Sequence, residues 1–415
     1  MKLLGKINYL LAFWVVSLTF FSLEAKGAVT EQVTEQDSTA AKFENVHISL
    51  LTCGGYDEVW ALYGHAAMRV EMPDTGEDVV ANWGLFDFHQ PNFIGRFVFG
   101  KCDYLMGIVP FKRFMEEFSS KGASVFQQEI NLTPKEKIAV VRALYENSLP
   151  ENCMYRYNFL YDNCASRPRD IIFNNVPERV IYNNVIDSTV TFRNIIHDNN
   201  EQKPWCRLGN DLLMGVNADN PTSREDQQFL PAFLERDFAN AMFVDSAGHK
   251  RAVVLKSQWI LKDNTTYEKE FPLSPAACGF ILMIVIAAVT VFERLRKKNF
   301  WILDTVLMSI CGILGLILFL MIFSEHPTVS FNLLILTFNP LLLVCMWRIV
   351  KELRGKKKPV VCRVYFCLVL LAILLTNKDV IPFALQNAPE GFFEVSIALL
   401  IRMVRMLVVR SNERG

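Results

Sequence analysis

Five long apolar stretches in the C-terminal third of the chain limit its fold more than any other feature. Each approaches the roughly 20 residues that an α-helix needs to cross the hydrocarbon core of a membrane. They lie at residues 274–292, 301–323, 329–347, 363–378 and 392–410. The fourth is short, and the fifth carries Arg402 and Arg405. We therefore predict an all-α transmembrane bundle of about five helices at residues 274–410.

The charges of the loops between these stretches predict the orientation of the bundle. Residues 293–298 and 350–362 are strongly basic, whereas residues 324–330 contain no Lys or Arg. Because Lys and Arg are enriched in cytoplasmic loops, the chain before the first helix should lie outside the cytoplasm. The uncharged loop lies on the same outer side. There His326 and Asn332 are expected to face a lipid headgroup, with hydrogen bonding between helices as the alternative.

The N-terminus carries a second, independent export signal. Lys2 and Lys6 precede an apolar run at residues 9–21, and small residues follow it. This order is typical of a secretory signal peptide, and an uncleaved anchor is the alternative. Residues 1–27 are therefore predicted to be a signal peptide or anchor. Residues 29–270 are predicted to form a periplasmic domain of a protein in the inner (cytoplasmic) membrane.

The overall charge indicates no polyanionic partner. Lys and Arg total 43, and Asp and Glu also total 43. The basic residues gather beside the apolar stretches, which is a topology signal rather than a nucleic-acid-binding surface. We therefore expect no nucleic acid as a partner. The chain also lacks a Gly-rich phosphate-binding loop, and no cofactor is expected.

The exported cysteines do not form a metal-binding pattern. The exported region contains Cys53, Cys102, Cys153, Cys164 and Cys206. None of these cysteines belongs to a CxxC pair. An oxidising compartment permits two disulfides among them and leaves one thiol free, and the sequence does not reveal the pairing. The histidines are not clustered with Cys or carboxylates at metal-ligand spacing, so no metal site is expected.

The exported region has the alternation and turn signals of a mixed α and β domain. The strands are predicted at residues 46–52, 65–72, 78–83 and 128–132. The helices are predicted at residues 57–63, 134–147 and 165–174. Thr133, with a Pro after it and Glu136 three residues on, is a strong start signal for the second helix. An α+β domain followed by a transmembrane bundle is the expected fold class.

Cys164 and His65 are the residues most suited to chemistry. Cys164 directly precedes the predicted helix at 165–174, where free N–H groups and the helix dipole stabilise a thiolate. A nearby imidazole would lower the thiol pKa further and then protonate a leaving group. His65 opens a strand after a glycine, which suits it to this position. The alternative is a structural role, with Cys164 in a disulfide or buried.

Other residues around this pair are candidates for support. The backbone N–H of Cys164 and the neighbouring Asn163 are the predicted oxyanion donors. A third group should orient the His65 imidazole. Asn82, on the strand expected to pair with that of His65, is the first candidate, and Asp87 is the second.

Three further residues are candidates for positioning the substrate. Arg167 and Asp170 lie on the predicted helix after Cys164. They are suited either to binding a phosphate or to forming ion pairs on a solvated helix face. Tyr63, which precedes His65 by two residues, is the third candidate.

Several segments together resemble the Lnb-type lipoprotein N-acyltransferases of Bacteroides-like bacteria. In the exported part these are residues 63–70 (YGHAAMRV), 82–88 (NWGLFDF) and 157–170 (YNFLYDNCASRPRD). In the membrane part, residues 325–332 and the pair Asn339-Pro340 are similar to the same family. The order of His before Cys is also similar to the permuted NlpC/papain-like thiol fold, which includes lecithin:retinol acyltransferase.

The resemblance implies an enzyme that works through an acyl thioester in a ping-pong sequence. It would move an acyl chain from a phospholipid donor to the α-amino group of a diacylglyceryl-cysteine at the N-terminus of an apolipoprotein acceptor. Cys164 would be the nucleophile and His65 the base. The matching motifs do not fix the third group, so Asn82 follows only from strand pairing.

Two other functions compete with this expectation. A membrane-tethered thiol hydrolase of the same fold would cut peptidoglycan peptides or phospholipid, but peptide cleavage gives no reason for five helices. A membrane receptor or assembly factor without enzymatic activity would use Cys164 only structurally. The reactivity of the Cys164 thiol distinguishes catalysis from structure.

Overall fold

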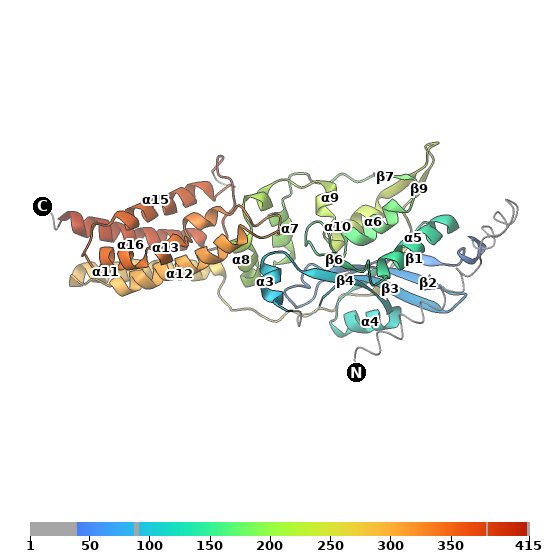
Figure 1. Cartoon of the computed structure of the whole chain (residues 1–415), viewed down its shortest axis with the longest axis horizontal. Helices are drawn as coiled ribbons and strands as arrows, with labels where there is room; N and C mark the ends of the chain where they lie inside the picture. The colour runs from blue at the N-terminus through green and yellow to red at the C-terminus, as the bar shows by residue number, and fades with distance from the viewer. Residues whose placement is uncertain (1–39, 87–90, 379–380, 413–415) are drawn as a thin grey trace. The chain divides into compact units, whose positions relative to one another are not determined.

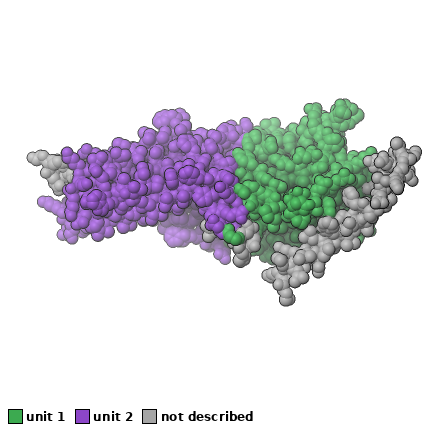
Figure 2. Space-filling view, viewed as in Figure 1, with its two compact units in different colours: residues 1–91, 102–187, 223–267 green, residues 92–101, 188–222, 268–415 purple. Residues whose placement is uncertain are grey.

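The computed structural model describes residues 40–86, 91–378 and 381–412 (Figure 1). Their contacts divide the chain into two compact units (Figure 2). Unit 1 comprises residues 1–91, 102–187 and 223–267, and unit 2 comprises residues 92–101, 188–222 and 268–415. The predicted signal segment, residues 1–27, and Asp87 lie outside the described residues.

Unit 1 is built on a seven-stranded antiparallel sheet with the order β10-β5-β1-β2-β3-β4-β6. Its strands are β1 (His47–Cys53), β2 (His65–Met72), β3 (Glu77–Leu85), β4 (Asp103–Pro110), β5 (Val125–Ile130), β6 (Met154–Arg156) and β10 (Val254–Leu261). A second sheet has the order β7-β8-β9, with β7 (Arg179–Tyr182), β8 (Ala241–Val244) and β9 (Lys250–Ala252).

Helices cover both faces of the large sheet in unit 1. Because side chains alternate along a strand, Leu51 and Leu50 of β1 point to opposite faces. Leu51 packs with Phe114 and Phe118 of α4 (Phe111–Ser120). On the opposite face, Gln128 of β5, paired with Leu50, donates to a backbone carbonyl of α10 (Pro231–Ala239). The remaining helices of unit 1 are α5 (Pro134–Ser148), α6 (Ser166–Asn174) and α9 (Arg224–Gln227) (Figure 1).

Most of the predicted elements of this unit are confirmed. Thr133 and Glu136 form a reciprocal capping box at the start of α5, as the sequence indicated. The strand predicted at 128–132 is β5, which begins earlier, at Val125. The helix predicted at 57–63 is wrong. That segment forms only turns, because it is short and Gly64, with φ of 74°, ends it at once.

Unit 2 contains the apolar helices α11 (Pro275–Arg296), α12 (Trp301–Met321), α15 (Val360–Leu375) and α16 (Phe392–Asn412). Between α12 and α15 the chain forms η2 (Leu333–Leu336), α13 (Leu341–Val344) and α14 (Met346–Leu353). Among the described residues, α11 and α12 are long and apolar enough to cross a membrane. The predicted bundle of apolar helices is thus confirmed.

The third apolar stretch is not the continuous helix that was predicted at 329–347. Its two parts, 333–344 and Met346–Leu353, meet at an angle of 92°. The bend lies at Cys345, between α13 and α14. Pro340 explains a separate interruption, between η2 and α13, because it lacks a backbone N–H and disfavours helical geometry at Asn339.

An ion cluster explains why the last apolar stretch carries arginines. Arg402 donates to Asp304 of α12 at 2.6 Å and also contacts Glu293 of α11. The three side chains are 3%, 4% and 0% exposed. Arg405 adds a second contact to Glu293 at 3.3 Å. Since isolated charges are costly in a membrane, these pairs account for the arginines and fix α16 against α11 and α12.

Residues before the first apolar helix also belong to unit 2. They form α3 (Phe93–Val98), α7 (Phe192–Asn199), α8 (Pro204–Leu213) and η1 (Val216–Asp219). Arg193 of α7 is buried between Asp211 and Asp219, at 2.8 Å from each. Asn332 donates to the carbonyls of Leu212 and Leu213. Part of the exported chain therefore packs with the outer loops of the transmembrane region.

Asn332 and His326, the two residues expected to face a lipid headgroup, have different surroundings in the structure. Asn332 is 7% exposed, and its side-chain oxygen accepts from the N–H of Leu334 while its amide is also engaged. The expectation that it faces a headgroup is therefore wrong, because its polar atoms are used inside unit 2. His326 donates from Nε2 to the carbonyl of Phe97 at 3.0 Å, and a contact with lipid remains a prediction for it.

Replacing Arg402 with Met should destabilise the transmembrane helices, because it leaves Asp304 buried without its counter-charge. Removing one partner of a buried ion pair costs about 3–5 kcal/mol in soluble proteins. We therefore expect a clear fall in the thermal unfolding midpoint of the detergent-solubilised protein. Lys101→Ala, which breaks only an exposed 3.8 Å contact with Glu325, should leave the midpoint unchanged. An unchanged midpoint for Arg402→Met would contradict this role.

Candidate active site

Cys164 lies in a turn directly before α6 in unit 1. The turn is held by Asn163, which is buried. Its side-chain oxygen accepts from the backbone N–H groups of Ala165 and Ser166, at 2.8 and 3.0 Å. Its amide donates to the carbonyls of two phenylalanines, Phe159 and Phe229. Both amide hydrogens are committed to the backbone, so we assign Asn163 to holding the turn rather than to an oxyanion.

His65 is the first residue of β2 and comes directly after Gly64. A Cβ at Gly64 would lie 2.6 Å from the carbonyl oxygen of Cys53, and its φ is 74°, so only glycine fits without strain. The close turn lets β2 begin opposite the end of β1, with Cys53 and His65 as paired residues. The position of the His65 imidazole thus depends on a backbone conformation that requires glycine at position 64.

Asn82 lies on β3, on the same face of the sheet as His65. Its neighbour across the strands is Ala67, two residues after His65. The Nε2–H of His65 donates to Oδ1 of Asn82 at 2.6 Å. This bond leaves Nδ1 of the ring for the thiol of Cys164, with which His65 is hydrogen-bonded. The structure therefore brings together the three residues that the sequence proposed as a catalytic set.

The charges of Cys164 and His65 support each other. Burial by itself raises the pKa of the Cys164 thiol, but the charge and hydrogen bond of His65 outweigh it, with help from the backbone N–H of Ala66. The pKa of Cys164 is therefore lowered. Burial by itself lowers the pKa of His65, and Cys164 and Asn82 together raise it. Both shifts favour a thiolate–imidazolium pair.

The pair is partly accessible. Cys164 and His65 are both partly exposed, and Cys164 is not engaged in a disulfide. Among those residues the backbone N–H of Cys164 donates to no carbonyl and turns toward its own sulfur. A substrate carbonyl at the sulfur would therefore find a free donor. The described residues contain no group of three or more His, Cys, Asp or Glu able to hold a metal ion.

The remaining candidates lie around this pair without a direct role in it. Arg167 forms a two-point ion pair with Asp162, at 2.6 and 2.7 Å, so its guanidinium already has an anion. Asp170 pairs with Arg169 at 2.7 Å. The ring of Tyr63 packs edge-on against that of Phe159, with the ring centroids 5.0 Å apart.

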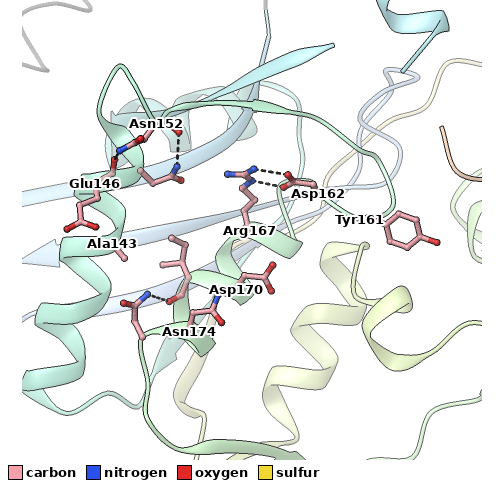
Figure 3. A pocket seen from close by; sticks show the side chains of 11 residues that line it. Ala143, Glu146, Asn152, Tyr161, Asp162, Arg167, Asp170 and Asn174 are labelled. Carbon is pink, nitrogen blue, oxygen red and sulfur yellow. Dashed lines mark hydrogen bonds and ion pairs between the residues drawn. The ribbon is translucent and has the colours of Figure 1, made fainter. Parts of the chain in front are cut away.

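A pocket of about 600 Å³ lies between α5 and α6 (Figure 3). Asp162, Arg167 and Asp170 line it together with polar residues of α5. Cys164 and His65 are not among its lining residues, so the pocket lies beside the thiol rather than at it. Of the two alternatives for Arg167 and Asp170, the ion pairs are the one that the structure contains.

Sequence reasoning missed a group of tyrosines near the thiol. Tyr155 of β6 and Tyr157 follow one another at strand spacing just before the Cys164 motif, and Tyr104 of β4 stacks on Tyr157 with a centroid distance of 4.1 Å. Burial and the charge of Cys164 raise the pKa of both Tyr155 and Tyr157. The alternation of tyrosines was the one sequence signal that could have revealed this group.

Replacing His65 with Ala should raise the pKa of Cys164, because burial is then no longer opposed by the imidazolium. In the wild type, alkylation of Cys164 by iodoacetamide should persist at pH values below the ordinary thiol range. In His65→Ala it should fall off as the pH decreases through that range. Peptide mass spectrometry measures this profile, with the Cys153 peptide as an internal reference. Superimposable Cys164 profiles for the two proteins would show that His65 does not control the thiol.

Two protein-family models match this chain, one in its N-terminal half and one in its C-terminal third. The Lnb N-terminal periplasmic domain model matches residues 34–197, and the Lnb transmembrane domain model matches residues 266–414. No curated protein and no solved structure gives a significant match. The two family-model matches show that the chain belongs to the Lnb family, membrane proteins of lipoprotein biogenesis with a periplasmic N-terminal domain.

Proposed function

We propose that this protein is a lipoprotein N-acyltransferase that works through a thioester on Cys164. The observation that carries the proposal is the hydrogen-bonded set of Cys164, His65 and Asn82. A thiolate activated in this way is suited to acyl transfer. Membership of the Lnb family is the second support. Lnb proteins act in lipoprotein biogenesis, and acylation of a lipoprotein is a step of that process.

The first half-reaction forms the acyl-enzyme. The thiolate of Cys164 attacks the ester carbonyl of a phospholipid and forms a tetrahedral intermediate. As the carbon–oxygen bond to the glycerol breaks, the imidazolium of His65 gives its proton to the departing oxygen. The products are a lysophospholipid and a thioester on Cys164, with His65 now neutral. Asn82 holds the imidazole in orientation throughout, since it accepts from the nitrogen that does not exchange protons.

The second half-reaction transfers the acyl chain to nitrogen. The neutral α-amino group of the diacylglyceryl-cysteine at the lipoprotein N-terminus attacks the thioester. Neutral His65 takes the proton from this nitrogen as the amide bond forms. The carbon–sulfur bond breaks, and Cys164 leaves as the thiolate beside the imidazolium. This restores the starting state, so the sequence is ping-pong and needs no cofactor or metal.

The membrane part of the chain fits substrates that are lipids at both steps. Donor and acceptor are each anchored in a bilayer by their acyl chains, so an enzyme that remains in the membrane meets both. We place the protein in the inner (cytoplasmic) membrane, with residues 29–270 as its periplasmic domain and residues 274–410 as its transmembrane domain. Exclusion of water from the thioester separates this activity from that of a phospholipase.

Deleting the protein should remove the N-linked acyl chain from lipoproteins, and Cys164→Ala should fail to restore it. Mass spectrometry of lipoprotein N-termini from complemented cells measures the result. Cys153→Ala is the matched control, because Cys153 is also a partly exposed free thiol of unit 1 and should restore acylation fully. Acylation restored by Cys164→Ala would refute the thioester mechanism. Lipoproteins whose N-acylation never depended on the chain would refute the function.

Replacing Asn82 with Ala should slow turnover by about 10- to 100-fold, because His65 loses its orienting bond while the thiol remains. The measurement is N-acylation of a synthetic diacylglyceryl lipopeptide by the purified protein in phospholipid micelles. Asn82→Asp should recover part of the rate, since a carboxylate can accept the same hydrogen bond. Full activity in Asn82→Ala would exclude Asn82 from the catalytic set.

A further inference from the structure

Attack on an ester places a negative charge on the carbonyl oxygen, and enzymes usually meet it with two donors. The free backbone N–H of Cys164 supplies one donor beside the sulfur. Asn163, the adjacent side chain, supplies none, because both of its amide hydrogens are bound to backbone carbonyls. The site therefore lacks a second donor among the residues that the sequence proposed.

The hydroxyl of Tyr155 has no acceptor for its hydrogen among the described residues. Tyr155 lies on β6, paired with Tyr104 of β4, and its side chain is part of the buried core, at 6% exposure. Its oxygen is fully covered, and its O–H finds no acceptor among the described residues. An unpaired buried hydroxyl costs free energy, so such a group in a folded protein calls for a functional explanation.

The surroundings of this hydroxyl leave its proton unbound. The backbone N–H of Gly84 approaches the phenol oxygen, and it can only donate to it. Gly84 has φ of 87° in the irregular stretch of β3 between Asn82 and Leu85. Gly84 therefore lies two residues after Asn82, the residue whose side chain orients His65. Tyr155 therefore retains a hydrogen to donate.

Two further features make Tyr155 suitable as a donor near the thiol. Burial, then the charge of Cys164, raise the pKa of Tyr155 well above its usual value, so the phenol stays protonated at neutral pH. The Arg167 guanidinium lies over the Tyr155 ring, 3.9 Å from its centroid, and Asp162 holds that guanidinium by two bonds. Arg167 follows Cys164 by three residues, so the same turn positions both the sulfur and the ring.

We propose that the hydroxyl of Tyr155 and the backbone N–H of Cys164 together bind the carbonyl oxygen that becomes anionic when Cys164 attacks an ester. Tyr155 donates a hydrogen bond and keeps its proton, so it is a catalytic residue without being an acid. The thioester step uses the same pair, because the amine attacks the same carbonyl carbon. The proposal rests on the proposed acyl transfer and adds the residue that stabilises its transition states. Arg167 is then a positioning residue for the Tyr155 ring.

The test is Tyr155→Phe in the full-length purified protein, with acyl-enzyme formation from phosphatidylethanolamine micelles followed by intact mass. Losing one oxyanion donor lowers kcat by roughly 100-fold or more, and we expect a loss of that size with little change in KM. The rate and pH profile of Cys164 alkylation should stay as in the wild type, because that reaction forms no oxyanion. A changed alkylation profile would show that Tyr155 acts on the thiol instead and would overturn the proposal.

Two matched variants complete the design. Tyr104→Phe removes a neighbouring hydroxyl of the same aromatic group and should keep near-wild-type activity. Tyr157→Phe tests the other tyrosine influenced by Cys164, and a large loss there with normal activity in Tyr155→Phe would overturn the assignment. If Tyr155→Phe unfolds, Arg167→Gln replaces it, and this variant should lower kcat while leaving Cys164 alkylation unchanged. Wild-type turnover in Arg167→Gln would then count against the proposal.

This proposal can fail separately from the proposed function. Acyl-enzyme formation that requires Cys164 but not Tyr155 would overturn only the oxyanion assignment. Absence of any acyl-enzyme in the wild-type protein would overturn the function itself.

Discussion

The active-site arrangement depends on the pairing of the Cys164 thiolate with the His65 imidazolium. Burial opposes the charged form of each group taken alone, and each is stabilised by the other. The surrounding fold serves this pair. Gly64 permits the sharp entry into β2, Asn82 binds the far side of the imidazole, and Asn163 fixes the turn that carries the sulfur. Moving any of these supports would leave one charge buried without its partner.

Buried charges in unit 2 are also paired with opposite charges. Arg402 is buried against two carboxylates of other apolar helices, and Arg193 is buried between two aspartates of the exported segment. Each cation is engaged by hydrogen bonds from several directions, which is the condition under which buried charges are tolerated. The Cys164–His65 pair of unit 1 is partly accessible, and it is therefore available for chemistry. The structural ion pairs of Arg193 and Arg402 are closed to solvent, whereas a substrate can reach the Cys164–His65 pair.

Much of the fold followed from local patterns in the sequence. An apolar run of strand length predicted β1, alternation and a turn predicted β2 and β3, and the Thr133–Glu136 capping box predicted the start of α5. These signals are local and therefore readable in one sequence. The bend at Cys345 was missed because the apolar run around it is continuous, and hydropathy does not record backbone geometry. The grouping of residues 188–222 with unit 2 depends on long-range packing, which no local pattern encodes.

The candidate site was predictable only in part, for the same reason. Cys164 and His65 stood out by residue type and position, and strand pairing pointed to Asn82. Asn163 was misjudged because adjacency to Cys164 in sequence does not show that its amide is bound to Phe159 and Phe229. Tyr155 was missed because its relevance lies in an unpaired buried hydroxyl, which appears only in three dimensions.

The central claim is that Cys164 carries the acyl chain between donor and acceptor. The most direct measurement is the intact mass of the purified protein after incubation with a phospholipid of defined acyl chain and no acceptor. The account predicts a mass increase of one acyl group that maps to Cys164, is released by hydroxylamine, and disappears when a diacylglyceryl lipopeptide is added as it becomes N-acylated. An unmodified Cys164 in protein that still N-acylates the lipopeptide would contradict it.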